Sequence, residues 1–164
     1  MHWQSDPAAA SVGPYAACPT VMTLLRAPRP EITAEVLNAR ARGQLAGLIG
    51  IEVLDLGEAG LRSHLTLRPE LLGANGYVHA ATLAALADTT CGFGALAFLP
   101  DGARSYATLE LAGNYVGAAR DGAVLCAAAP IELARQTQIW EAVCVTAGDG
   151  RRLAVFRCTQ LVLY

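Results

Sequence analysis

Asp88 is the one charged residue in a long apolar segment, residues 80–99. If a helix begins near Ala80, Asp88 lies about two turns inside it, ~12 Å along the axis. A carboxylate held there, away from solvent, can act as a general base or as a nucleophile. The alternative is an Asp that is merely satisfied by neighbouring hydroxyls, such as those of Thr89 and Thr90. The spacing alone leaves both interpretations open.

The start of the predicted helix supplies a group that complements this carboxylate. Free backbone N–H groups at Ala80 and Ala81, at the positive end of the helix dipole, can bind a carbonyl oxygen that becomes an oxyanion. A simple tight turn into a helix is the alternative. His79 comes immediately before; it can be a catalytic histidine, but a capping or loop-fixing role is favoured.

Three further polar residues are candidates for the same site. Thr108 lies in a strand-like run in which Leu109 and Leu111 are expected to point the other way, so that its hydroxyl can reach the cavity; an ordinary strand threonine is the alternative. Arg120 and Arg135 fall at predicted strand ends, where guanidinium groups can contact phosphates. Solvated surface arginines are the favoured interpretation of both.

Several common kinds of site are missing from the sequence. No G-x-S-x-G segment or glycine-rich nucleotide loop occurs, which counts against triad hydrolases, kinases and dehydrogenases. The five cysteines show no CxxC or Cys/His metal spacing. We therefore expect no metal and no cofactor, and we interpret the cysteines as core residues in a reducing compartment. They are Cys18, Cys91, Cys126, Cys144 and Cys158.

The composition bounds the possible partners. The chain has 164 residues, 54% hydrophobic and only 16% charged, which suggests apolar surface hidden against another subunit. A formal net charge of -2 makes nucleic acid an unexpected partner. Residues 80–99 are long enough to cross a membrane, but they are rich in Ala, Thr and Gly, and a central charge would be costly in lipid. We expect no membrane partner and, without a targeting signal at the N-terminus, a cytoplasmic protein.

The chain divides into an arm and one domain. Residues 1–30 hold five of the eight prolines and no clear period, which predicts an irregular N-terminal arm. Residues 31–164 form the predicted single domain. It opens with a helix that ends near Gly43, because Glu35 lies early and Arg40 late.

The rest of the domain alternates like a sheet around the long helix. Ile49, Ile51 and Val53 alternate on a first strand, and a turn at residues 57–60 leads to a second, closed by Pro69. After the helix, four more strands are expected at residues 105–116, 123–133, 137–146 and 153–163. This order predicts an α+β fold, with two early strands and a late four-stranded meander in a curved antiparallel sheet wrapped around one central helix.

Two segments carry a resemblance to a known family. The sequence NGYVHAA at residues 75–81, followed by LADT at 86–89, resembles the signature of hotdog-fold acyl-CoA thioesterases of the PaaI type, the phenylacetic acid degradation branch. That family typically shows a G-x-x-H-G-G turn and an L-A-D-T segment further along the helix. The resemblance covers about residues 45–163, including the closing segment 156–160.

The resemblance implies a hotdog fold and assigns roles by position. Asp88 matches the carboxylate that activates water or attacks the thioester. Ala80 matches the glycine whose N–H polarises the thioester carbonyl, and Thr108 matches a Ser/Thr that helps place the water. His79, Ala81 and Thr89 lie in the same motif and are expected near the substrate, and Arg120 and Arg135 are further candidate substrate contacts.

Two positions depart from the family pattern. Ala80 and Ala81 replace the usual Gly-Gly, which keeps the N–H donors but adds methyl groups beside the path of the substrate. A carbonyl-binding Asn or Gln, often found seven residues before the first glycine, is replaced by Gly73, so that its role is vacant or is taken over by Asn75.

The family resemblance also implies an assembly and an activity. The site would lie between two subunits of a homodimer or a dimer of dimers, and the enzyme would hydrolyse an aryl or medium-chain acyl-CoA to the free acid and CoA. One alternative is a hotdog enoyl-thioester hydratase or dehydratase, which pairs a carboxylate with a His. The other is a non-catalytic acyl-CoA binding module, which the Ala80-Ala81 and Gly73 departures make credible.

Overall fold

The computed structural model describes residues 26–164. Two short helices, α1 (Ala34–Ala41) and α2 (Leu45–Ile49), precede a hairpin of β1 (Glu52–Gly57) and β2 (Gly60–Thr66). A 3₁₀ turn, η2 (Pro69–Leu71), leads into the long helix α3 (Ala80–Ala97). The last four elements are β3 (Ser105–Tyr115), β4 (Ala123–Leu133), β5 (Thr137–Thr146) and β6 (Arg152–Leu163).

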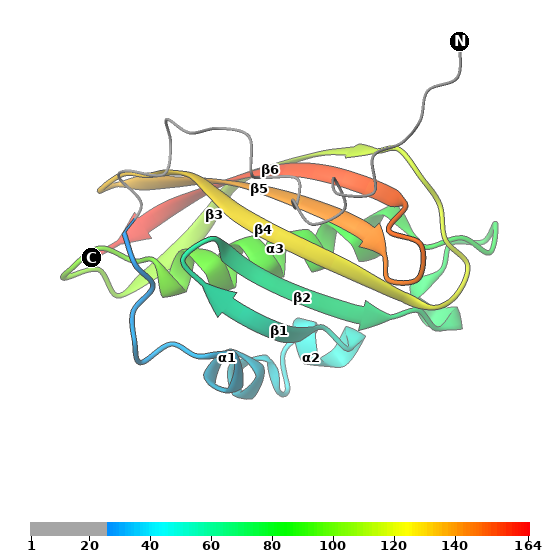
Figure 1. The fold of residues 1–164 in the computed structure, drawn as a ribbon, viewed down its shortest axis with the longest axis horizontal. Helices are drawn as coiled ribbons and strands as arrows, with labels where there is room; N and C mark the ends of the chain where they lie inside the picture. The colour runs from blue at the N-terminus through cyan, green and yellow to red at the C-terminus, as the bar shows by residue number, and fades with distance from the viewer. Residues whose placement is uncertain (1–25) are drawn as a thin grey trace, which may run out of the picture.

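All six strands form one antiparallel sheet in the order β1-β2-β4-β5-β6-β3. The sheet curves along α3, and α1 and α2 lie beside β1 (Figure 1). This confirms the predicted α+β architecture of a curved sheet around one long helix.

The predicted four-stranded meander is wrong in its first strand. β4, β5 and β6 pair in sequence, but β3 pairs with β6 at the far edge, and β4 pairs with β2 instead. At ~4.8 Å per strand the step from β3 back to β4 covers ~14 Å. Residues 116–122 connect the two strands, and seven residues can span ~23 Å. The connection is therefore long enough to place β3 beside β6 instead of beside β4, and the alternation within each strand does not reveal this strand order.

The first strand also begins later than expected. Ile49 ends helix α2 rather than starting a strand, because Gly50 takes a left-handed φ of 85° at its C-cap and Arg68 donates to the carbonyls of Leu48 and Ile49. The helix expected to end near Gly43 is present as α1.

Helix α3 has the length and hydropathy of a membrane span, but it is the core helix of this fold, with 61% of its residues buried. Two of its glycines allow the sheet to approach closely. A Cβ at Gly92 would lie 2.7 Å from the Tyr106 hydroxyl, and a Cβ at Gly94 would lie 2.7 Å from the Trp140 ring. The close packing of the sheet that glycine permits at these two positions offsets the low helix propensity of glycine.

Gly94→Ala should therefore destabilise the protein, although alanine is the better helix former. Trp140 is fully buried, packs edge-on against Phe98 and donates from its indole N–H to Gln138. Because that ring cannot move aside, we expect the free energy of unfolding to fall by about 1–3 kcal/mol in chemical denaturation. The penalty should shrink in a Trp140→Phe background, where the colliding ring atoms are absent. An equal penalty in both backgrounds would contradict this explanation.

The last residues of the predicted arm pack across the carboxyl end of α3. Arg29 donates its backbone N–H to Ala97 O at 2.7 Å, and Arg26 donates to Phe98 O at 2.8 Å. The Arg29 guanidinium donates to three more carbonyls just beyond the helix, those of Leu99, Pro100 and Ala103. Positive charge at this end suits the helix dipole. Residues 1–25, which include Cys18 and most of the arm, lie outside the described residues.

Candidate active site

Asp88 lies half-buried on α3 and bonds across to the sheet. The Thr108 hydroxyl on β3 donates to Asp88 Oδ1 at 2.9 Å. The neighbouring hydroxyls on the helix do not bond to Asp88. Thr90 bonds to Ser63 and to Leu86 O, and Thr89 forms no side-chain hydrogen bond within residues 26–164. The structure thus brings together the predicted carboxylate and the predicted strand hydroxyl, 20 residues apart in the chain.

A β-bulge in β3 follows Thr108 and changes the direction of the residues after it. Thr108 is opposite Gln160 and Glu110 is opposite Thr159, so that Leu109 is an extra residue on this strand. Leu111 consequently packs towards the core on the same side as Thr108, whereas Leu109 is 58% exposed. The expectation that both leucines point away from Thr108 is therefore wrong, because the bulge shifts the alternation by one residue.

Sequence reasoning missed the other side chains around Asp88. Gln160 Oε1 lies 3.2 Å from Thr108 Oγ1, and Cys158 Sγ lies 4.0 Å from Asp88 Oδ1. Both belong to β6 and face α3. Burial and the charge of Asp88 raise the pKa of Tyr106 to about 12, which keeps that phenol neutral beside the site. A glutamine on the inward face of β6, which is otherwise apolar, was the one available signal.

The cysteines of the described chain are core residues, as predicted, because the four of them are buried and free. A hydrogen bond with Cys158 and burial hold the pKa of Cys91 well above its usual range, and a hydrogen bond with Cys126 and burial do the same for the pKa of Cys144. Such thiols are neutral and poor nucleophiles. Within residues 26–164 no three His, Cys, Asp or Glu side chains form a metal-binding group.

At the start of α3, one of the two predicted amide donors is already used. His79 is the N-cap, and its Nδ1 accepts the N–H of Ala81 at 3.0 Å. The prediction of a free Ala81 amide is therefore wrong. The N–H of Ala80 has no acceptor among the described residues, and Ala80 is exposed. The structure thus gives His79 the capping role and leaves Ala80 as the available donor.

The turn before the helix explains the departure at Gly73. Asn75 Oδ1 accepts the N–H of Tyr77 at 3.2 Å, and Gly76 has a φ of 73°. A Cβ at Gly73 would lie 3.2 Å from Asn75 Oδ1 and 3.6 Å from His79 Cδ2. The Asn75 side chain thus lies beside the position that a side chain at Gly73 would occupy. Its oxygen is held in the turn, which leaves the amide NH₂ group to meet a ligand.

Arg120 lies next to this turn. Its guanidinium stacks 4.2 Å from the centroid of the Tyr77 ring and donates to the Tyr77 hydroxyl at 2.8 Å. No carboxylate of residues 26–164 forms an ion pair with it. An arginine with this placement is free to meet an anion near the helix start.

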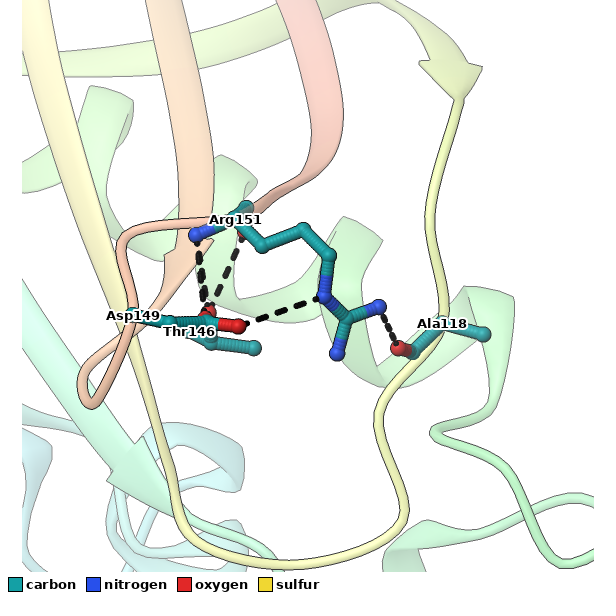
Figure 2. Close-up of polar contacts among 4 residues, drawn as sticks. All are labelled: Ala118, Thr146, Asp149 and Arg151. Carbon is teal, nitrogen blue, oxygen red and sulfur yellow. Dashed lines mark hydrogen bonds and ion pairs between the residues drawn. The ribbon is translucent and has the colours of Figure 1, made fainter.

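The loop that carries Arg120 is fastened on two sides. Val78 N donates to Ala119 O at 2.7 Å, and the Arg151 side chain reaches from the β5–β6 turn to Ala118 O at 2.5 Å (Figure 2). Within that turn Asp149 accepts from Thr146 and from Arg151 N, and these bonds lower the pKa of Asp149. Asp149 therefore carries a negative charge, and its ion-pair partner is Arg151 rather than Arg120.

Arg135 lies at the other end of the sheet. It follows β4, beside the ring of Tyr164 at 5.6 Å, whereas Arg120 precedes β4. Eleven strand residues separate the two ends by ~36 Å. One chain therefore does not bring the two predicted phosphate contacts to one place.

A cavity lies elsewhere in the molecule. It has about 610 Å³, and its wall includes Leu54, Arg62, Leu125 and Val145 from the sheet. These residues alternate with those that face α3, and neither Asp88, Ala80 nor Thr108 borders it. We therefore place the candidate active site at the residues that could carry the chemistry rather than at this cavity.

Comparison with known proteins shows the family to which this chain belongs. The sequence model of the thioesterase superfamily matches residues 75–154, which include the turn, α3 and Thr108. A proofreading thioesterase, EntH of Cronobacter turicensis, is 30% identical over 132 residues, 80% of this chain and 95% of that protein. The chain belongs to the thioesterase superfamily. As a member it is a thioester hydrolase.

Other members of the thioesterase superfamily agree in sequence and fold. The 1,4-dihydroxy-2-naphthoyl-CoA hydrolase of Escherichia coli is 26% identical over 81% of this chain and 96% of its own. A mutant thioesterase PA1618 structure from Pseudomonas aeruginosa superposes with a TM-score of 0.79 at 22% identity, over 83% of this chain and 97% of that one. The E. coli PaaI structure gives 0.69 at 16% identity, over 80% and 96%. These likenesses confirm the predicted hotdog fold.

Proposed function

We propose that this thioesterase hydrolyses an acyl-CoA thioester to the free acid and CoA at a site shared by two copies of the chain. The observation that carries the proposal is the pair of Asp88 and Thr108 on one side of the fold, together with the free amide of Ala80 at the start of the same helix. A carboxylate and an oxyanion donor are the two groups that thioester hydrolysis requires.

The proposed reaction divides the work among three residues. The Ala80 N–H binds the thioester oxygen and stabilises the negative charge that develops there. Asp88 either takes a proton from the attacking water or attacks the carbonyl carbon itself. Thr108 orients the Asp88 carboxylate and helps to place the water. The C–S bond breaks and the CoA thiolate leaves. If Asp88 is the base, the proton that it took from water passes to the thiolate or to solvent. If Asp88 is the nucleophile, water hydrolyses the mixed anhydride, which releases the acid and restores the carboxylate, and the thiolate is protonated from solvent.

The distance between Ala80 and Asp88 supports a second copy of the chain at the site. Ala80 and Asp88 of one chain are eight positions apart on one helix, ~12 Å along its axis. Both groups must lie ~3 Å from a single thioester to act on it. The carboxylate of one copy must therefore meet the helix start of another.

The edge strand β3 is where that second copy would join. β3 carries Thr108 and ends the sheet formed by residues 26–164, among which one side of its 11-residue backbone has no partner strand. Leu109, Tyr115 and Val116 are 58%, 48% and 62% exposed along or just beyond it. Pairing there would cover this apolar surface and bring Asp88 to the subunit boundary. A dimer of dimers is the larger assembly we propose, and the buried thiols favour the reducing cytoplasm as its location.

We propose an aryl or medium-chain acyl group as the substrate. The E. coli relative is named for a naphthoyl-CoA, an aromatic thioester. The methyl groups of Ala80 and Ala81 narrow the entrance at the helix start, which suits a flat or slender acyl group. The hydratase alternative requires a His paired with the carboxylate, but His79 bonds to the helix amide of Ala81 and Asp88 bonds to Thr108.

The decisive experiment is a panel of aryl-CoA, medium-chain and long-chain acyl-CoA substrates, with release of free thiol as the readout. We expect turnover that is fastest with an aryl or medium-chain group. Tight binding without thiol release across the panel would support a binding module. Hydration of an enoyl-CoA without thiol release would support a hydratase, and either result would overturn the proposal.

Arg120→Ala tests whether the loop beside the helix start holds the nucleotide part of CoA. We expect KM for an acyl-CoA to rise about tenfold, the scale of one charge-assisted hydrogen bond, with little change in kcat. An acyl-pantetheine substrate, which lacks the nucleotide, should show no such change. Arg104→Ala is the matched control, since Arg104 is exposed beyond the opposite end of α3. Equal KM changes with both substrates would identify Arg120 as a structural surface arginine.

A further inference from the structure

Gln160 is a fully buried amide on β6, in a part of the core where its neighbours on the same face, Cys158 and Val162, are not charged. A buried amide is costly unless its groups are hydrogen-bonded. Gln160 Nε2 donates to Cys158 Sγ at 2.9 Å, and Oε1 accepts from the Thr108 hydroxyl at 3.2 Å. Both of these partners also contact the same atom, Asp88 Oδ1: Thr108 Oγ1 lies 2.9 Å from it and Cys158 Sγ lies 4.0 Å from it.

The Thr108 hydroxyl therefore has one proton and two acceptors. A hydroxyl donates one hydrogen bond but can also accept. While Asp88 is ionised, the charge-assisted bond is the stronger one, and the proton points to Asp88 Oδ1. When Asp88 loses its negative charge in the reaction, that attraction weakens. If Oδ1 then carries a proton, Thr108 has to accept a hydrogen bond from it, and its own proton needs another acceptor. Gln160 Oε1 is already within reach.

We infer that Gln160 is a positioning residue that allows the Thr108 hydroxyl to serve both charge states of Asp88. With Asp88 ionised, Thr108 donates to it; with Asp88 neutral, the hydroxyl turns to Gln160 and offers its oxygen to Asp88. Thr108 and Gln160 neither gain nor lose a proton, and Asp88 holds the proton taken from water until it passes to the leaving thiolate or to solvent. The inference rests on the proposed catalytic role of Asp88.

The fold holds Gln160 firmly in place. β6 pairs with β5 on one side and with β3 on the other, so that Gln160 lies opposite both Gln138 and Thr108. Its amide is fixed from the other end by Cys158. Gln138 is equally buried but serves only the packing of the helix end, since it accepts from Trp140 and donates to Phe98 O. Neighbouring strands thus offer a matched pair of buried glutamines, one beside Asp88 and one away from it.

The test replaces each glutamine by methionine, which has a similar length and no acceptor oxygen. For Gln160→Met we expect kcat to fall about tenfold, the scale of one net hydrogen bond, with KM within about twofold of wild type. Gln138→Met should lower thermal stability and leave kcat unchanged. In a Thr108→Val background, where no hydroxyl is left to turn, Gln160→Met should cause no further loss of kcat.

Several results would overturn the inference. They are an unchanged kcat in Gln160→Met, a rise in KM alone, or the same loss of kcat with and without the Thr108 hydroxyl. If Gln160→Met fails to fold, Gln160→Asn takes its place, because it keeps the amide on a shorter stem that cannot reach Thr108, and the same loss of kcat is expected. Failure of the proposed function is recognised separately, by activity that survives Asp88→Asn.

Discussion

Asp88→Asn should leave a folded protein that no longer releases thiol from acyl-CoA. The change removes the charge and the ability to take a proton, but the amide oxygen of the substituted side chain can still accept the Thr108 hydroxyl bond. General acid–base catalysis contributes about 10²–10⁴-fold, and a nucleophilic role would make the loss larger. We therefore expect kcat to fall by at least ~10³-fold, with substrate affinity and the free energy of unfolding close to wild type.

Asp101→Asn is the matched control for this prediction. Asp101 is an exposed carboxylate in the turn just after α3, and its neutralisation removes the same charge from the same helix region. We expect full activity. Retention of most thiol release by Asp88→Asn, in protein that unfolds cooperatively at the wild-type midpoint, would refute the assignment. Single turnovers in isotope-labelled water separate the two roles, because label in the Asp88 carboxylate identifies a mixed anhydride and hence a nucleophile.

Ala80→Pro should abolish most of the activity without breaking the helix. Ala80 is the first residue of α3, a position where proline fits because its missing N–H has no helical partner. His79 has φ -69° and ψ 140°, the extended conformation that a residue before proline requires. The His79 cap on Ala81 is kept. The substitution thus removes the proposed oxyanion donor and little else.

The expected loss follows from the value of such a donor. Removing one oxyanion donor typically costs about 10²–10³ in kcat, so we expect a decrease of that size with the free energy of unfolding within ~1 kcal/mol of wild type. Ala80→Gly is the control, since it restores the glycine of the family pattern and keeps the N–H; it should remain active. If folded Ala80→Pro turned over substrate at the rate of Ala80→Gly, the Ala80 amide would have no part in the reaction.

Much of the candidate site could be predicted because it depends on local sequence patterns. A lone carboxylate in a run of apolar residues marked Asp88, and the turn sequence before that run marked the helix start. Burial of α3 against the sheet follows from the same run. Each of these features depends on residues within a few positions of one another, where side-chain period and turn chemistry act directly.

The roles of His79 and Ala81 show where such reasoning stops. The sequence placed both at the helix start, but which amide remained free depended on a side chain that turns back onto the backbone. His79 caps Ala81 and so leaves a single donor. The turn that presents His79 is held by backbone hydrogen bonds from His79 N to Leu71 O and from Val78 N to Ala119 O, which lie elsewhere in the chain.

The sequence by itself determined the elements, the central helix and the residue that carries the charge, because these follow from alternation and composition along the chain. Only the tertiary structure decided that β3 is an edge of the described sheet, that the Thr108 hydroxyl lies within hydrogen-bond distance of Asp88, and that Gln160 lies behind that hydroxyl. Strand order and cross-strand contacts join residues 20 to 52 positions apart. Such pairings are selected by the packing of the whole sheet on α3, and no local segment contains the information that fixes them.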